Sequence, residues 1–190
     1  MVEENDLKLW HDAGRVARRT LESVKDEIKA GASWHDVIEK AEKYIIRHGG
    51  KPAFPTTIAV DNVAAHFTTD HNATPLEGWE DKMIFEKGQL VKLDVGVQIH
   101  GRIGDNALTI EVGNGSNHTE QIRASRESRD SAIEQMHPGT PWHKIGAVAE
   151  QVAKHSGGQH YALSGLAGLP EALHSEEALT TVIHREKDMW

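Results

Sequence analysis

Two aspartates near the middle of the chain, Asp94 and Asp105, could together bind a cation. They lie in residues 89–114, where apolar and polar residues alternate on both sides of a short turn at residues 100–101. Alternation with a period of two predicts two antiparallel strands joined as a hairpin. With a two-residue turn, Asp94 faces Ala107, and Asp105 becomes its diagonal neighbour on the same face, about 7 Å away between backbones.

Two carboxylates on one face of an apolar strand pair repel each other unless a positive group lies between them. A hard divalent metal ion would meet that need. The spacing fits a solvent-facing hairpin with hydrated acids equally well, because the outer faces of strands are often charged. A three-residue turn would separate Asp94 from Asp105, so the strand register tests the prediction.

Composition limits the ligands that any metal could have. The chain has no cysteine, so a metal would have to bind His, Asp or Glu. Its 21 basic and 29 acidic residues give a net charge of -8, which disfavours nucleic acid and anionic lipid as partners. With 190 residues and 38% hydrophobic content we expect a globular core. We find no leader-like start and no run near the roughly 18 apolar residues of a membrane span, and expect a cytoplasmic protein.

Helices are expected on both sides of the hairpin. Apolar spacing predicts one helix over about residues 6–29 and a second that Ser33 opens as its cap. Residues 51–66 follow as extended chain, strand or loop, because prolines disfavour helix there. After the hairpin we expect helices over residues 119–136 and from Pro141 onward.

An internal repeat relates the two pairs of helices. An offset of 108 residues pairs Trp34 with Trp142, Arg15 with Arg123, Gly31 with Gly139, His35 with His143, Ala41 with Ala149, and Glu42 with Glu150. We interpret this as a duplicated helix-helix-strand unit in an α+β fold, whose halves could pack about a pseudo-twofold axis and form a site between them. The same offset relates His66 to His174, which gives each half one histidine.

Residues 53–68 (AFPTTIAVDNVAAHFT), residues 91–110 (VKLDVGVQIHGRIGDNALTI) and the flanking helices resemble the type-2, archaeal-like methionine aminopeptidases. The resemblance covers about residues 5–165. It implies the duplicated "pita-bread" fold of creatinases and aminopeptidases, and an enzyme that removes the N-terminal methionine from nascent proteins. It also implies two divalent metal ions (Co, Mn, Fe or Zn) as cofactors, and N-terminal Met peptides and the ribosome as partners.

The resemblance also assigns roles to residues of this chain. Asp94 would bind one cation through both oxygens, and Asp105 would bridge the two cations. His66 and His174 would contact the substrate, and no residue is assigned a direct catalytic role. The metals would activate water for attack on the first peptide carbonyl and hold the free amino terminus.

The sequence departs from the family pattern after Gly165. Leu166 stands where the resemblance places a metal-binding histidine, and no glutamate matches either of the two further ligands; the spacing favours none of His160, Glu176, Glu177 and Glu186. We therefore expect a pita-bread core over residues 1–165, and a divergent tail over residues 166–190 in a shortened or frame-disrupted chain, so that the fold is incomplete at its C-terminal end.

Three functions remain open on the sequence. The first is an active methionine aminopeptidase, and the second is a non-catalytic pita-bread homologue that binds peptides or a protein partner. A complete set of metal ligands would separate these two. The third is a creatinase-like or prolyl-peptidase hydrolase of the same fold, which the AAHFT and GRIGDNA runs disfavour.

Overall fold

The computed structural model describes residues 4–69, 83–113 and 115–155. The chain divides into two compact units, one up to Gly115 and one from Ser116 onward. Within the described ranges, no helix is both long and apolar enough to cross a membrane.

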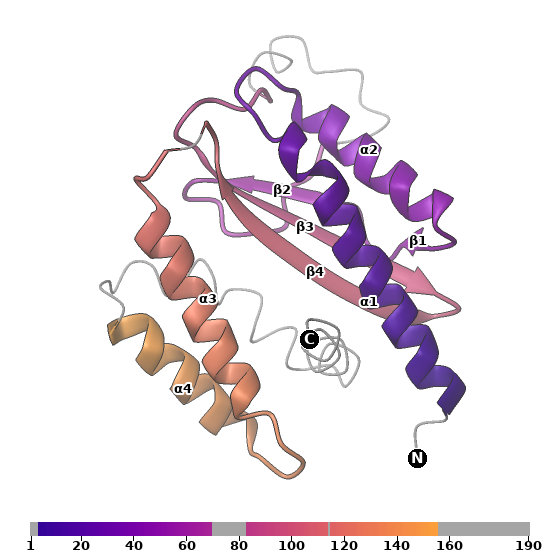
Figure 1. Cartoon of the computed structure of the whole chain (residues 1–190), viewed down its shortest axis with the longest axis vertical. Helices are drawn as coiled ribbons and strands as arrows, with labels where there is room; N and C mark the ends of the chain where they lie inside the picture. The colour runs from indigo at the N-terminus through magenta and orange to yellow at the C-terminus, as the bar shows by residue number, and fades with distance from the viewer. Residues whose placement is uncertain (1–3, 70–82, 114, 156–190) are drawn as a thin grey trace. The chain divides into compact units, whose positions relative to one another are not determined.

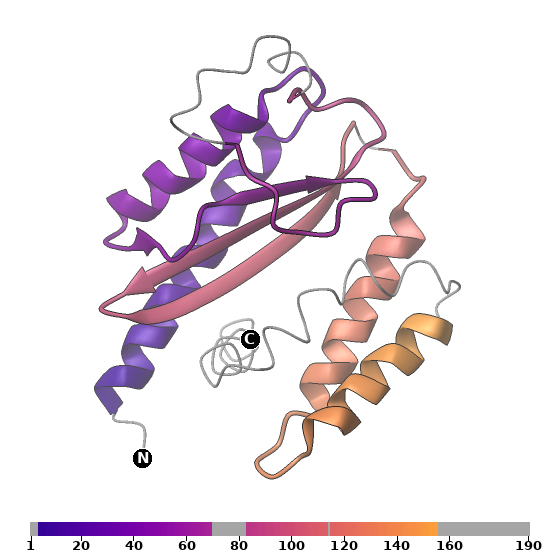
Figure 2. The ribbon, with the colours of Figure 1, turned by 180° about the vertical axis from the view of Figure 1, so that it is seen from behind.

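The first unit is a four-stranded antiparallel sheet with helices on one face. Its elements in chain order are α1 (Glu4–Val24), the 3-10 helix η1 (Lys25–Glu27), α2 (Trp34–Arg47), β1 (Lys51–Pro52), β2 (Thr57–Val60), β3 (Leu90–Ile99) and β4 (Arg102–Glu111). Strand β3 is central, with β4 along one edge and β1 and β2 along the other. Both helices cover the same face of the sheet (Figure 1), and the view from behind shows the opposite face in front of them (Figure 2).

The core of this unit lies between the helices and the odd-numbered side chains of β3. Its fully buried members include Ala17 and Leu21 of α1, Val37, Ile38, Ala41 and Ile45 of α2, and Val91, Leu93, Val95 and Val97 of β3. Helix α1 also makes a backbone contact with β4. A Cβ atom at Gly104 would lie 2.3 Å from the backbone nitrogen of Gly14, so only glycine allows this approach.

The tip of the hairpin is joined to the first turns of α1. The guanidinium of Arg102 donates a hydrogen bond of 2.7 Å to Asp6 and lies 5.4 Å from the ring centre of Trp10. Together with the contact at Gly104, this pairing holds the N-terminal half of α1 against the first residues of β4.

Helix boundaries in the first unit follow the expected signals with one difference. The Ser33 side chain accepts a hydrogen bond from the Asp36 backbone N–H at 3.4 Å, which confirms the predicted cap of α2. Helix α1 ends at Val24, before the predicted residue 29, because the chain tightens into η1 and then leaves helical geometry at Ile28 (φ -77, ψ 82).

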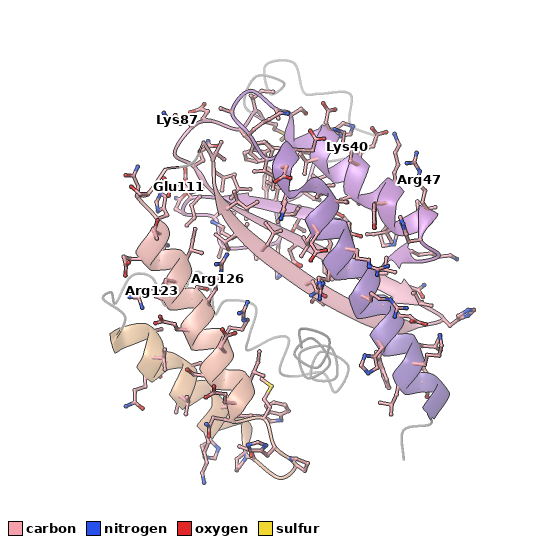
Figure 3. All side chains as sticks on the ribbon, in the orientation of Figure 1. Lys40, Arg47, Lys87, Glu111, Arg123 and Arg126 are labelled. Atoms are coloured by element: carbon pink, nitrogen blue, oxygen red, sulfur yellow. The ribbon has the colours of Figure 1, made fainter. Side chains whose placement is uncertain are left out.

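The second unit consists of α3 (Thr119–Glu134) and α4 (Trp142–His155). Ala132, Ile145 and Ala149 form its buried cluster, with Met136 packed against them, and the Ser128 hydroxyl donates 2.8 Å to the Ala149 carbonyl. Figure 3 marks Arg123 and Arg126 on α3, where Arg123 pairs with Glu120 and Glu127.

The repeat predicted from the sequence is visible in the helices. The offset of 108 residues maps both ends of α2 onto the ends of α4, and Gly31 and Gly139 share a left-handed backbone, with φ of 84° and 87°. Helix α4 begins at Trp142, one residue later than predicted. Trp142 itself is 40% exposed, whereas Trp34 stacks on Phe85. The described part of the second unit holds no other Trp, Phe or Tyr against which Trp142 could pack.

Candidate metal centre

The register of the hairpin places Asp94 and Asp105 on one face. Ile99 pairs with Arg102 and Asp94 with Ala107, so the turn has two residues, as predicted. Both turn residues have a positive φ, 49° at His100 and 82° at Gly101, which is the geometry of a type I′ hairpin turn. Asp105 pairs with Gly96 and is therefore the diagonal neighbour of Asp94.

The carboxyl group of Asp94 is held in an environment that disfavours its charge. Its Oδ1 atom is buried and has no hydrogen-bond partner among the described residues. Burial, followed by the charge of Asp105 and a hydrogen bond between the two groups, raises the pKa of Asp94 to about 8. Burying an oxygen that accepts no hydrogen bond costs free energy unless a cation or a hydrogen-bond donor reaches it.

Asp105 is the more open of the two aspartates. Desolvation raises its pKa and the hydrogen bond with Asp94 lowers it. As a whole residue Asp105 is exposed, so water still reaches part of it. Asp94 is therefore the carboxyl that has lost its solvation, and Asp105 is the side of the pair that water reaches.

No cation of the described residues neutralises this pair. Lys92 lies on the same face of β3 as Asp94, but its ammonium donates a 2.7 Å hydrogen bond to the Asp61 carbonyl. Burial lowers the pKa of Lys92, and the charge of Asp61 opposes that effect. In residues 4–69, 83–113 and 115–155, neither Asp94 nor Asp105 forms an ion pair with a basic side chain.

The donor set suits a hard or borderline divalent ion. Carboxylate oxygens bind Mn, Fe, Co and Zn. Oδ1 of Asp94, which has no hydrogen-bond partner among the described residues, is available to coordinate such an ion. The described residues contain no group of three or more His, Asp or Glu side chains that could enclose a metal. Asp94 and Asp105 therefore fit a metal ion as two of its ligands.

An aromatic ring that the sequence analysis did not assign to the site lies beside the acids. A Cβ atom at Gly96 would be 2.2 Å from Cε1 of Phe54, so the Phe54 ring rests against the backbone between the two aspartates. The Ala53 N–H donates 2.9 Å to the Gly96 carbonyl and holds this segment on β3. Two features of the sequence could have indicated this contact. They are a glycine, Gly96, on the face of β3 that carries Asp94, and the prolines on both sides of Ala53-Phe54.

His66 lies in the loop that follows β2, outside any metal-ligand cluster of the described residues. Its backbone is left-handed, with φ of 63°, and its side chain is exposed. Strand β2, which precedes this loop, pairs with β3, and Thr57 lies opposite Asp94 in that pairing. The role of His66 in binding substrate stays a prediction. His174, His160, Leu166, Glu176, Glu177 and Glu186 lie outside the described residues.

The fold agrees with comparison against known families. The chain belongs to metallopeptidase family M24, whose family model matches residues 8–184. That match passes Gly165, where the sequence analysis begins a separate tail, and the boundary there stays a prediction.

Several curated relatives are methionine aminopeptidases of archaea. The chain is 34% identical to that of Thermococcus onnurineus over 142 residues, which are 75% of this chain and 45% of the relative. It is 34% identical to that of Pyrococcus horikoshii over 80% of this chain and 48% of the relative. These relatives confirm the predicted resemblance, and the chain spans about half of their length.

Solved structures show the same fold. Methionine aminopeptidase from Thermotoga maritima superimposes with a TM-score of 0.72 at 23% identity, over 83% of this chain and 63% of that one. Prolidase from Pyrococcus furiosus gives a TM-score of 0.68 at 25% identity, over 82% of this chain and 44% of that one. The predicted α+β pita-bread fold is confirmed.

Proposed function

We propose that this chain acts in the metal-dependent removal of N-terminal methionine from nascent proteins. The observation that carries the proposal is the diagonal pair of Asp94 and Asp105, with an orphaned, buried oxygen on Asp94. Support comes from the family membership and from relatives that are named methionine aminopeptidases.

In this proposal Asp94 and Asp105 hold divalent ions on the open face of the hairpin. When bound, such ions polarise a peptide carbonyl and activate water near neutral pH. The Phe54 ring beside Gly96 offers an apolar surface to a methionine side chain and keeps water from one side of the acid pair. His66, exposed in its loop, contacts the bound peptide, and His174 has the same role.

A second candidate is a non-catalytic homologue that binds N-terminal peptides or a protein partner. The observation that favours it is the lack of any third ligand near the acid pair within the described residues. Catalytic metal sites use three or more protein ligands, so two carboxylates alone would hold an ion weakly.

The experiment that tests the proposal is calorimetric titration of the full chain with Co²⁺ and Mn²⁺, run beside cleavage of the peptide Met-Ala-Ser. Asp94→Asn and Asp105→Asn remove the proposed ligands, and Asp26→Asn is the matched control, since Asp26 is exposed on η1. Binding and cleavage that are lost only in the first two variants support the proposal. Peptide binding without cleavage supports the second candidate, and equal metal affinity in all variants contradicts the metal centre.

A further inference from the structure

Asp61 makes three hydrogen bonds with residues of strand β3. Its N–H donates 2.9 Å to the Leu90 carbonyl, and its Oδ1 accepts 2.8 Å from the Leu90 N–H. Its carbonyl accepts 2.7 Å from the ammonium of Lys92. The residue has a left-handed backbone with φ of 49°, which aspartate tolerates better than most side chains.

These contacts close one end of a short loop whose other end is also held. Beyond His66, the Phe67 carbonyl accepts 2.8 Å from the Ile58 N–H of β2. The Thr68 hydroxyl donates 2.7 Å to the Thr56 carbonyl, one residue before β2 begins. Residues 61–67 therefore form a loop that is held on β3 at Asp61 and on β2 at Phe67, and His66 lies within it.

Lys92 connects this loop to the metal centre through the strand itself. It stands two residues before Asp94 on the same face of β3, and half-burial of its side chain costs free energy unless the ammonium is hydrogen-bonded. The single backbone contact, from the Asp61 N–H to the Leu90 carbonyl, could hold the start of the loop on β3. The Asp61 carboxylate and the Lys92 ammonium each add a side-chain hydrogen bond, to the Leu90 N–H and to the Asp61 carbonyl, and fasten the loop beyond that need.

We infer that Asp61 and Lys92 are positioning residues, which hold the loop bearing His66 against the strand bearing Asp94. They thereby set the distance between the histidine and the acid pair. The inference rests on the proposed function only in giving His66 a contact with substrate. How firmly Asp61 and Lys92 hold the loop is a property of the folded chain and can be measured without enzymatic turnover.

The test is hydrogen exchange of the ¹⁵N-labelled full chain by NMR, together with the imidazole signals of His66, identified by their loss in His66→Ala. Asp61→Gly keeps the left-handed backbone and removes only the side-chain acceptor, while Asp61→Asn retains an acceptor oxygen. Lys92→Met removes the ammonium at similar length. Lys87→Met is its matched control, since Lys87 is exposed three residues before β3 (Figure 3).

Loss of one hydrogen bond should weaken closure of the loop by roughly two- to tenfold. In Asp61→Gly and Lys92→Met we expect exchange of the Val63 and Ile58 amides to rise by that factor and the His66 signals to shift. Asp61→Asn and Lys87→Met should match the parent chain. If only the Leu90 amide changes and His66 and Ile58 do not, the contacts merely close a turn and the inference is wrong. Should Asp61→Gly fail to fold, Lys92→Met decides the question alone.

Kinetics separate this inference from the proposed function. If the parent chain cleaves Met-Ala-Ser, Asp61→Gly and Lys92→Met should each raise KM more than they lower kcat, and the affinity for the metal should not change. If the parent chain does not cleave, the proposed function fails, and the exchange and imidazole measurements still decide whether Asp61 and Lys92 position His66.

Discussion

Lys92 and Asp94 lie two residues apart on the same face of β3, yet the Lys92 ammonium binds the Asp61 carbonyl at 2.7 Å and does not pair with Asp94, whose Oδ1 has no hydrogen-bond partner among the described residues. A lysine at that distance could have neutralised the acid and made the pair a structural ion pair. Because Lys92 is bound elsewhere, no basic side chain of the described residues compensates the negative charge that Asp94 and Asp105 carry when they ionise.

The first prediction concerns the metal ligands. Asp94→Asn and Asp105→Asn should each lower the affinity for Co²⁺ or Mn²⁺ by more than the roughly 10- to 100-fold that loss of an outer-shell partner costs. His66→Ala should leave that affinity largely intact, because His66 lies outside any metal-ligand cluster of the described residues. Calorimetry checks both statements, and equal affinities in all three variants would overturn the assignment.

The second prediction concerns stability in the presence of a chelator. The folded pKa of Asp94, about 8, lies above its ordinary value of 3.8, so the native state keeps a proton that the unfolded state releases. The contribution of Asp94 to the free energy of unfolding should therefore be fully present below about pH 4 and be lost as pH rises towards 8. The slope for one proton is at most about 1.4 kcal/mol per pH unit.

Urea unfolding at several pH values measures this dependence. Asp94→Asn removes one of the two carboxyls whose pKa is raised and should make the profile less steep, while the control Asp26→Asn should keep the slope of the parent chain. Identical profiles for Asp94→Asn and the parent would show that the carboxyl of Asp94 ionises normally in the folded chain.

The third prediction concerns the contact between Gly96 and Phe54. Gly96→Ala forces a methyl group into the Phe54 ring and should destabilise the chain by about 1–3 kcal/mol. Phe54→Ala removes the obstructing ring, so the double variant should be less destabilised than the sum of the single variants. Gly14→Ala is the control. Its added methyl meets nothing within 4 Å and should stabilise α1 by up to about 1 kcal/mol. Additive effects of Gly96→Ala and Phe54→Ala would contradict the contact.

The fourth prediction concerns the approach of α1 to β4. Gly104→Ala places a methyl group against backbone atoms of Ala13 and Gly14, which cannot move aside without displacing the helix. We expect a loss of stability at or above the upper end of the same range of about 1–3 kcal/mol. Truncating side chains of α1 should not restore it. Thermal unfolding checks this, and a variant as stable as the parent would show that α1 does not approach β4 so closely.

Local signals predicted much of the first unit. Alternation and a two-residue turn were enough to give the register from Ile99 to Arg102, and thus the shared face of the two aspartates. The cap at Ser33 gave the start of α2. Such features depend on residues that are close in sequence, whose preferences for strands, turns and helix caps are well known.

The contacts that the sequence did not reveal join residues far apart in the chain. Phe54 reaches Gly96 across 42 positions, and Lys92 reaches the Asp61 carbonyl across 31. No periodicity encodes either contact, because each depends on how β1 and β2 align along β3. The end of α1 at Val24 was missed for a smaller reason, since a 3-10 turn preserves the apolar spacing that predicted a longer helix.

The diagonal placement of the two acids also bears on how the hairpin finds its pairing during folding. A slip of β4 by one residue would turn Asp105 from the open face towards the apolar layer beneath α1, where an unpaired carboxylate costs several kcal/mol. The carboxylate that we propose as a metal ligand in the native state thus also penalises the misfolded hairpin with the nearest register. Replacing Asp105 by an apolar residue would remove both the proposed ligand and this penalty against mispairing.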